Sequence, residues 1–248
     1  MLLSFLIAAL SVSSSMIEML GEKIWENECG KNDQKLTHWN QGESFGSFGI
    51  GHFIWFPKEC QAPMQQTFPQ LLVFLQKHQT PLPPFLQKHP CCPWSSYEDF
   101  HLHIHSPEMA QLRQFLKETK SLQALFIFKR LEEALPSMLN QLIEPQKTRC
   151  KDLFFRLAAT PQGLYALVDY VNFKGLGTSP FETYQGMGWV LLQVLQEIPE
   201  GSSSPLNEFI KAAESILRRR VENAPKEREE QRWLKGWIKR VHTYGQSF

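Results

Sequence analysis

The sequence predicts a mainly α-helical (α+β) protein with one small β-hairpin or sheet near its N-terminus. Apolar residues recur at helical spacing over most of the chain after residue 107. Several expected helices begin with a proline at their first helical position, as at Pro161 and Pro225. The stretch 45–56 is instead rich in glycine and aromatic residues, and each glycine would weaken a helix by about 1 kcal/mol.

The composition is that of a globular protein with one large or two small domains. Of the 248 residues, 42% are hydrophobic and 12% aromatic, which is enough for a packed core. The formal net charge of +1 gives no reason to expect nucleic acid as a partner. We expect no cofactor, because Gly46, Gly49 and Gly51 lack the order of a dinucleotide- or phosphate-binding loop.

The first fifteen residues have the character of an export signal. An apolar run from Leu2 to Leu10 precedes small residues that offer a signal-peptidase-like site. We interpret residues 1–15 as a signal peptide and expect a periplasmic or secreted protein. The usual positive n-region is missing, and a buried helix start is the alternative interpretation. No segment approaches about 20 continuous apolar residues, so no membrane span is expected.

We expect residues 16–248 to form a single domain that begins with an amphipathic helix over 16–27. The apolar residues of this helix share one face, and Gly30 is placed to end it. Residues 45–56 follow as the hairpin. Within it, Trp55 and Phe56 are typical of core positions.

The middle of the chain is predicted to be a long, mostly irregular segment, and the chain after it is predicted to be helical. Residues 60–106 hold seven of the sixteen prolines and include one helix near 68–78. In the last helix Trp233 and Trp237 are four residues apart and are expected to anchor the core. The expected helices from Pro107 onward lie near 107–119, 121–143, 151–159, 161–173, 184–198, 205–223 and 226–244.

Glu28 is the residue best suited to chemistry. At 100° per residue it falls on the stripe of Ile17, Leu20 and Ile24, so its carboxyl group ends a buried face. Burial disfavours the charged form of a carboxyl group, and a general acid near neutral pH needs the protonated form. The alternative is an ordinary Glu that faces solvent at a frayed helix end.

The residues that follow Glu28 resemble the lysozyme superfamily. Phage-type lysozymes have a catalytic Glu at the end of their first long helix and then a hairpin with a Thr-x-Gly-x-Gly-His pattern. Ser47-Phe48-Gly49-Ile50-Gly51-His52 is similar, with Ser in place of Thr, and is also similar to the Gly-rich strand of goose-type lysozymes and lytic transglycosylases. The resemblance covers residues 16–57. It implies a lysozyme-like fold with the sheet beside a cleft, and cleavage of a polysaccharide, foremost peptidoglycan, with Glu28 as general acid.

The sequence departs from the resemblance at the second carboxylate. Phage-type enzymes place an Asp between the Glu and the hairpin, whereas Asp33 and Glu43 match that spacing poorly. We take Glu43, next to the hairpin, as the candidate, with a solvated turn residue as the alternative. Cleavage with two carboxyl groups needs them roughly 5 to 9.5 Å apart. If Glu28 acts alone, a transglycosylase-like route is favoured, in which a sugar hydroxyl attacks the anomeric carbon.

Five further residues are candidate substrate contacts. Trp39 and His52 are expected at the cleft, because flat apolar faces cover the C–H surfaces of sugars. A polar, Gly-punctuated loop between two helices contributes two more, for which helix capping and turn closure are the alternative roles. The full set is Trp39, Ser47, His52, Asn172 and Tyr184.

Metal and disulfide chemistry are less well supported. His101, His103 and His105 alternate, so a strand would place all three on one face, near Cys91 and Cys92 in sequence. The spacing is not that of an ordinary zinc site, and we expect no metal. Five cysteines leave the pairing open, although a Cys29–Cys60 disulfide would brace the segment that carries Glu28.

Three functions follow from these observations. The first is a glycan-cleaving enzyme, with chitosan or chitin as the variant substrate. The second is a lysozyme-fold glycan-binding or scaffold protein that has lost turnover, since one fold hosts several functions. The third is an exported metal-binding protein built on the histidine cluster.

Overall fold

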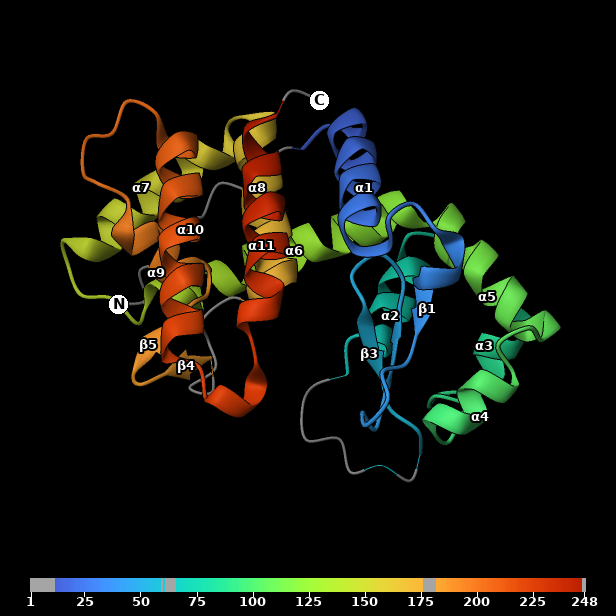
Figure 1. The fold of residues 1–248 in the computed structure, drawn as a ribbon. Coiled ribbons are helices and arrows are strands. Elements are labelled where there is room, and N and C mark those ends of the chain that lie inside the picture. The colour runs from blue at the N-terminus through green and yellow to red at the C-terminus, as the bar shows by residue number, and fades with distance from the viewer. Residues whose placement is uncertain (1–11, 59, 61–65, 176–181, 247–248) are drawn as a thin grey trace. The chain divides into compact units, whose positions relative to one another are not determined.

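The computed structural model describes residues 12–58, 60, 66–175 and 182–246. This part of the chain is mainly helical, with eleven α-helices, a three-stranded antiparallel sheet and a two-stranded antiparallel sheet (Figure 1). The predicted mainly α class with a small sheet near the N-terminus is therefore confirmed. Most of the expected signal peptide, residues 1–11, lies outside the described residues.

Among the described residues, no helix combines the length and the apolar character that a membrane crossing requires.

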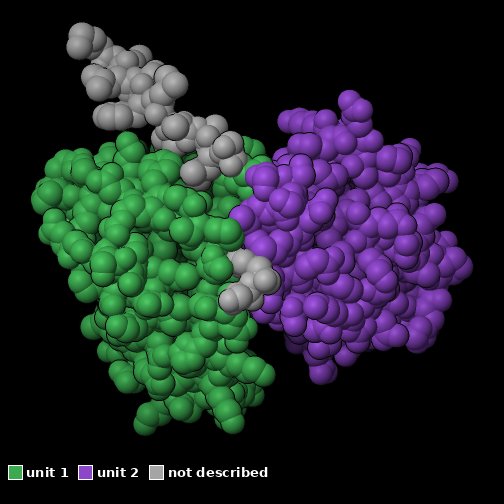
Figure 2. Space-filling view, turned by 90° about the horizontal axis from the view of Figure 1, so that it is seen from above, with its two compact units in different colours: residues 1–12, 128–248 green, residues 13–127 purple. Residues whose placement is uncertain are grey.

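The contacts within the chain form two compact units (Figure 2). The N-terminal unit is Ser13–Ile127, and the C-terminal unit holds Phe128–Phe248 together with Met1–Val12. The boundary falls inside helix α6 (Lys120–Leu139). The single domain expected over 16–248 stays a prediction, and the contacts divide these residues between the two units. Periodicity predicts a helix but does not say which neighbours its two ends pack against.

The N-terminal unit begins with α1 (Ser14–Cys29), which confirms and slightly extends the predicted first helix. The Ser13 hydroxyl accepts a hydrogen bond from the backbone N–H of Met16 at 3.2 Å and so satisfies one unpaired donor of the first turn. Gly30 ends the helix at φ 58, a left-handed conformation that the lack of a Cβ permits. The apolar face predicted for this helix is buried.

A short 3₁₀-helix, η1 (Asp33–Leu36), leads into the three-stranded sheet. Its strands lie in the order β1-β2-β3, and His38 pairs with Ser47 while Phe48 pairs with Phe53. The predicted hairpin corresponds to β2 and β3, and β1 adds a strand that was not predicted. The bounds are Thr37–His38, Gly46–Phe48 and Phe53–Trp55.

A buried aromatic cluster holds this sheet in place. Its ring centroids lie between 4.8 and 6.4 Å apart, and each edge-to-face or tilted pair adds to the hydrophobic burial. Trp55 and Phe56 are buried, so their predicted core positions are confirmed. The cluster consists of Phe48, Trp55, Phe68, Trp94 and Phe100.

Four helices complete the N-terminal unit before α6. The predicted helices near 68–78 and 107–119 are confirmed as α2 and α5, whereas α3 and α4 inside the irregular segment predicted over 60–106 were missed. Short helices give too few turns for a periodic signal. The bounds of α2, α3, α4 and α5 are Phe68–Lys77, Pro84–Lys88, Tyr97–Leu102 and Pro107–Glu118.

His101 lies in α4 and His103 is the C-cap of that helix, so the three alternating histidines do not form the strand that the zinc interpretation would need. Alternate residues of a helix point in different directions, so the shared face that the zinc interpretation required is lost. Within the described ranges, no three His, Cys, Asp or Glu side chains are arranged to hold a metal ion. All five cysteines are described, and each is a free thiol, so the Cys29–Cys60 disulfide is not formed.

The C-terminal unit is built around α8, whose residues 163–170 are all buried. The helices predicted near 151–159, 161–173 and 205–223 are confirmed. The bounds of α7, α8, α9, α10 and α11 are Gln146–Ala158, Pro161–Lys174, Leu191–Glu197, Pro205–Asn223 and Gln231–His242.

Two expectations for this unit need correction. The helix predicted over 184–198 begins instead as a hairpin of β4 (Thr183–Tyr184) and β5 (Met187–Gly188), because Gln185 and Gly186 turn the chain with positive φ. The helix predicted over 226–244 is divided into η2 (Lys226–Arg228), α11 and η3 (Thr243–Gly245). In α11 the buried residues are Leu234 and Val241, and Trp233 is exposed rather than a core anchor.

Two carboxylates of the C-terminal unit are buried and paired. Asp169 accepts hydrogen bonds from the Arg240 guanidinium at 2.8 Å and from the Tyr244 hydroxyl at 2.7 Å. Glu230 accepts from Arg220 at 2.7 and 2.8 Å and from Arg228 at 3.1 Å. Such pairing offsets the cost of removing each charge from water.

Candidate functional site

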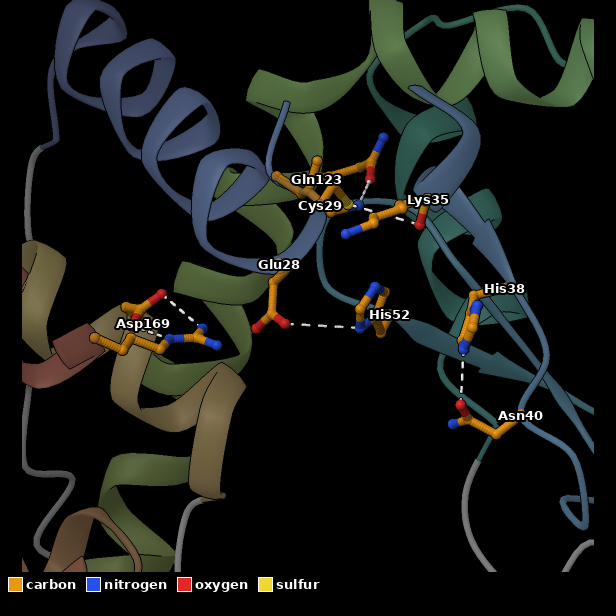
Figure 3. Close-up of polar contacts among 10 residues, drawn as sticks. Glu28, Cys29, Lys35, His38, Asn40, His52, Gln123 and Asp169 are labelled. Atoms are coloured by element: carbon orange, nitrogen blue, oxygen red, sulfur yellow. Dashed lines mark hydrogen bonds and ion pairs between the residues drawn. The ribbon is translucent and has the colours of Figure 1, made fainter. Parts of the chain in front are cut away.

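Glu28 lies in the last turn of α1 and contacts His52 across the N-terminal unit (Figure 3). The distance from its Oε2 atom to Nδ1 of His52 is 3.6 Å. The Glu28 side chain is only 14% exposed, and the His52 side chain is 35% exposed. Glu28 is therefore held against a partner at the edge of the core, and the alternative of a frayed, solvent-facing residue is wrong.

The turn between β2 and β3 presents the imidazole ring of His52. Gly49 donates its backbone N–H to the carbonyl of Leu36 at 2.7 Å, and His52 donates its own to the carbonyl of Gly49 at 3.2 Å. His52 has φ 46, a left-handed conformation that costs a residue with a Cβ roughly 1–2 kcal/mol. Such strain persists only where the surrounding structure holds the residue in place.

His38 and Asn40 extend this contact into a row of polar side chains. The His38 ring centroid lies 6.5 Å from that of His52, with the two rings inclined by 31°. Nε2 of His38 lies 2.7 Å from Oδ1 of Asn40, and both side chains are exposed. We call Glu28, His52, His38 and Asn40 the polar row; Figure 3 shows them in this order.

Sequence reasoning missed His38 and Asn40, although a signal for both was present. His38 ends β1, and the exposed residues 38 and 40 lie on either side of the buried Trp39, an alternation that is typical of extended chain. Trp39 is buried, contacts the Phe100 ring at 5.9 Å and donates its indole N–H to the Glu43 carbonyl at 2.9 Å. Trp39 is therefore a core residue that also lines a pocket with Glu43, and its expected role at a sugar cleft stays a prediction.

Glu43 does not join the polar row. It lies in the loop between β1 and β2, whereas His52 lies in the turn between β2 and β3. In an antiparallel sheet these two connections sit at opposite ends of β2. The structure therefore separates Glu43 from the partner of Glu28, and the two carboxyl groups are not brought together as a catalytic pair.

Glu43 instead lines a separate pocket of about 470 Å³ with Ser95, Ser96 and Tyr97. Its Oε2 atom is buried and has no hydrogen-bond partner within the part of the chain that the structure describes. Ser47, another predicted contact, is buried in the middle of β2, where it pairs with His38 and with β3. Its backbone supports the polar row, and its side chain is not on the exposed surface.

Asn172 and Tyr184 belong to the C-terminal unit and are not part of the polar row. Asn172 is half-buried on α8. The Tyr184 hydroxyl donates to Oε1 of Glu230 at 2.9 Å, and burial together with this hydrogen bond raises the pKa of the phenol. Tyr184 thus has a structural role in the buried pairing of Glu230.

Cys29 follows Glu28 directly but does not supply a nucleophile. Its thiol is buried and donates to the Lys35 carbonyl at 3.6 Å (Figure 3). Burial, with a contribution from the charge of Glu28, raises the pKa of the Cys29 thiol to about 12. The thiolate is the reactive form, so this thiol is inert near neutral pH.

Comparisons of the chain with protein-family models, with curated proteins and with solved structures find no match. The polar row is therefore the feature of this protein that bears on its function.

Proposed function

We propose that this protein is a glycan-cleaving enzyme that acts on peptidoglycan, with Glu28 as its general acid. The observation that carries the proposal is the 3.6 Å contact between Glu28 and His52. It places a largely buried carboxyl group beside a partly exposed imidazole ring. A group of this kind, at the border of core and surface, is suited to meet a substrate oxygen.

The reaction needs one proton and one stabilised cation. In the proposed step the protonated Glu28 gives its proton to the glycosidic oxygen, the bond between that oxygen and the anomeric carbon breaks, and an oxocarbenium-like centre forms. A hydroxyl group then bonds to the anomeric carbon and gives its proton to the Glu28 carboxylate, which restores the acid. His52 orients the carboxyl group, while His38 and Asn40 offer exposed hydrogen-bonding groups to sugar hydroxyls.

The polar row contains one carboxylate, and this favours one of two routes. A retaining or inverting hydrolase uses a second carboxyl group within about 10 Å of the acid. Because Glu43 lies at the far end of β2, we propose that a hydroxyl of the sugar itself attacks the anomeric carbon. The product then carries an anhydro end, as in a lytic transglycosylase. Such an enzyme works in the periplasm or outside the cell, in line with the expected export signal.

The test is the release of muropeptides from isolated peptidoglycan, followed by mass spectrometry. The variants are Glu28→Gln and, as a matched control, Glu26→Gln, which changes an exposed carboxylate of the same helix that pairs with Lys23 and Lys31. We expect release by the wild type and by Glu26→Gln, and a loss of at least about 100-fold for Glu28→Gln. Released muropeptides with anhydro ends would support the transglycosylase route. Muropeptides with reducing ends would show hydrolysis instead.

Three results would contradict the proposal. If Glu28→Gln releases as many muropeptides as the wild type, Glu28 is not the general acid. Cleavage of chitosan but not of peptidoglycan changes the substrate class. If the folded wild type sediments with peptidoglycan but releases nothing, the glycan-binding alternative replaces the enzyme.

A further inference from the structure

We propose that Gln123 is a positioning residue for the Glu28–His52 pair, an inference that rests on the proposed function. Gln123 lies in the first turn of α6 and belongs to the same unit as the polar row. Its side chain is polar yet fully buried. Figure 3 shows it directed at the turn that carries His52.

Both ends of the Gln123 amide have hydrogen-bond partners. Its Oε1 accepts from the backbone N–H of Ile50 at 2.9 Å. Its Nε2 donates to the carbonyl of Leu116 at 2.6 Å and to the hydroxyl of Thr119 at 2.9 Å. Because one end meets a donor and the other meets acceptors, the amide has one favourable orientation. It therefore links the β2–β3 turn to the end of α5.

Gly49 makes room for this link. A Cβ at position 49 would collide with Oε1 of Gln123, and the φ of 75 at this residue is a conformation that glycine adopts without strain. The carbonyl of Gly49 in turn accepts from the N–H of His52. The turn and the buried amide are thus matched to one another, and the position of the His52 ring depends on both.

Removal of the amide would affect the site through the turn. The N–H of buried Ile50 would lose its acceptor, and a buried donor without a partner is unfavourable enough to shift the local backbone. His52 is held in a strained conformation, so it is the residue most sensitive to such a shift. A displacement of about 1 Å in a catalytic group reduces turnover by up to roughly 100-fold.

The test compares Gln123→Met, which keeps the size of the side chain but not its hydrogen bonds, with Gln123→Glu, which in its protonated form keeps both the acceptor for Ile50 and a donor for Leu116. The control is Gln114→Met, the same change at an exposed residue of α5. The first readout is the imidazole NMR spectrum of His52, assigned with His52→Gly. The second is the separation of kcat from KM with peptidoglycan fragments.

We expect the His52 resonances to shift in Gln123→Met and to return toward the wild type in Gln123→Glu, with Gln114→Met unchanged. In Gln123→Met, kcat should fall about 10- to 100-fold with KM nearly constant, because the binding surface of the polar row remains. Unchanged His52 resonances in a folded Gln123→Met variant would overturn the inference.

Two further outcomes need their own interpretation: a wild type without glycan cleavage, and a Gln123→Met variant that does not fold. If the wild type shows no glycan cleavage, the proposed function fails, but the NMR comparison still decides whether Gln123 positions His52. If Gln123→Met does not fold, Thr119→Val removes only the hydroxyl to which Gln123 donates. A smaller shift of the His52 resonances is then expected, and its absence would contradict the inference.

Discussion

Oε2 of Glu28 lies 3.6 Å from Nδ1 of His52, and the two residues reach one another from different kinds of structure. Glu28 comes from the end of a capped helix, and His52 comes from a turn in which it has a left-handed backbone. The left-handed backbone of His52 is therefore one of the features that this contact needs.

The left-handed conformation of His52 predicts an unusual order of stability. His52→Gly should be more stable than His52→Ala by about 1 kcal/mol, because glycine avoids the Cβ clash of this conformation while alanine retains it. Urea unfolding of both variants measures the difference. An alanine variant that equals or exceeds the glycine variant would contradict the turn geometry.

Gly49 and Gly42 form a matched pair for a second prediction. Both have positive φ, at 75 and 88, but an added Cβ meets Gln123 at position 49 and open space at position 42. Gly42→Ala should cost about 1 kcal/mol of unfolding free energy from backbone strain alone. Gly49→Ala should cost roughly 1–3 kcal/mol more, because the buried amide must also move. Equal losses in urea unfolding would show that the Gln123 contact is unimportant for stability.

The buried thiol of Cys29 predicts a loss of stability at alkaline pH. Burial raises the pKa of this thiol from its ordinary value of 9.0 to about 12. Between these values the unfolded chain releases the proton and the folded chain keeps it, so the unfolded state is favoured as pH rises. Each such thiol lowers the unfolding free energy by roughly 1 kcal/mol per pH unit over this window.

Cys29→Ala tests this prediction, with urea unfolding under reducing conditions from about pH 8 to about pH 11. The variant should be less stable near neutral pH, because it leaves a cavity, but its stability should fall less steeply with pH. Cys92, whose pKa burial also raises to about 12, keeps its own contribution in both proteins. Parallel pH profiles for the wild type and Cys29→Ala would contradict the assignment.

Glu230 predicts different roles for two arginines that contact the same carboxylate. Arg220 has a side chain that is 12% exposed, whereas that of Arg228 is 55% exposed. Arg220→Met should destabilise the protein by roughly 3 kcal/mol, because it leaves a buried charge poorly paired. Arg228→Met should cost less than about 1 kcal/mol, since an exposed ion pair contributes little. Similar losses in urea unfolding would contradict this distinction.

The same carboxylate predicts a pH dependence. Burial raises the pKa of Glu230, but hydrogen bonds from Arg220 and Tyr184 outweigh it and hold the pKa below the ordinary value of 4.5. A depressed pKa contributes stability above the unfolded value, and this contribution is lost as pH falls through the folded value. The difference between wild type and Arg220→Met should therefore shrink as the pH falls below about 4.5. If the stability difference between wild type and Arg220→Met stays constant at acid pH, the prediction is contradicted.

The sequence by itself determined the features that depend on local spacing. The first helix, its Gly30 end and the hairpin of residues 45–56 follow from hydrophobic period and from the conformational freedom of glycine. The choice of Glu28 followed from the same period, because a residue on the apolar stripe of α1 must lie near the core.

Only the tertiary structure decided which residues accompany Glu28. The order of the strands places His38 beside the hairpin and moves Glu43 to the far end of β2. Trp39 is buried in the core. Gln123 of α6 is buried where it accepts a hydrogen bond from the turn that carries His52. Contacts between residues distant in sequence decide strand pairing and side-chain packing. Hydrophobic period and short motifs describe only local spacing, so they could not predict these contacts.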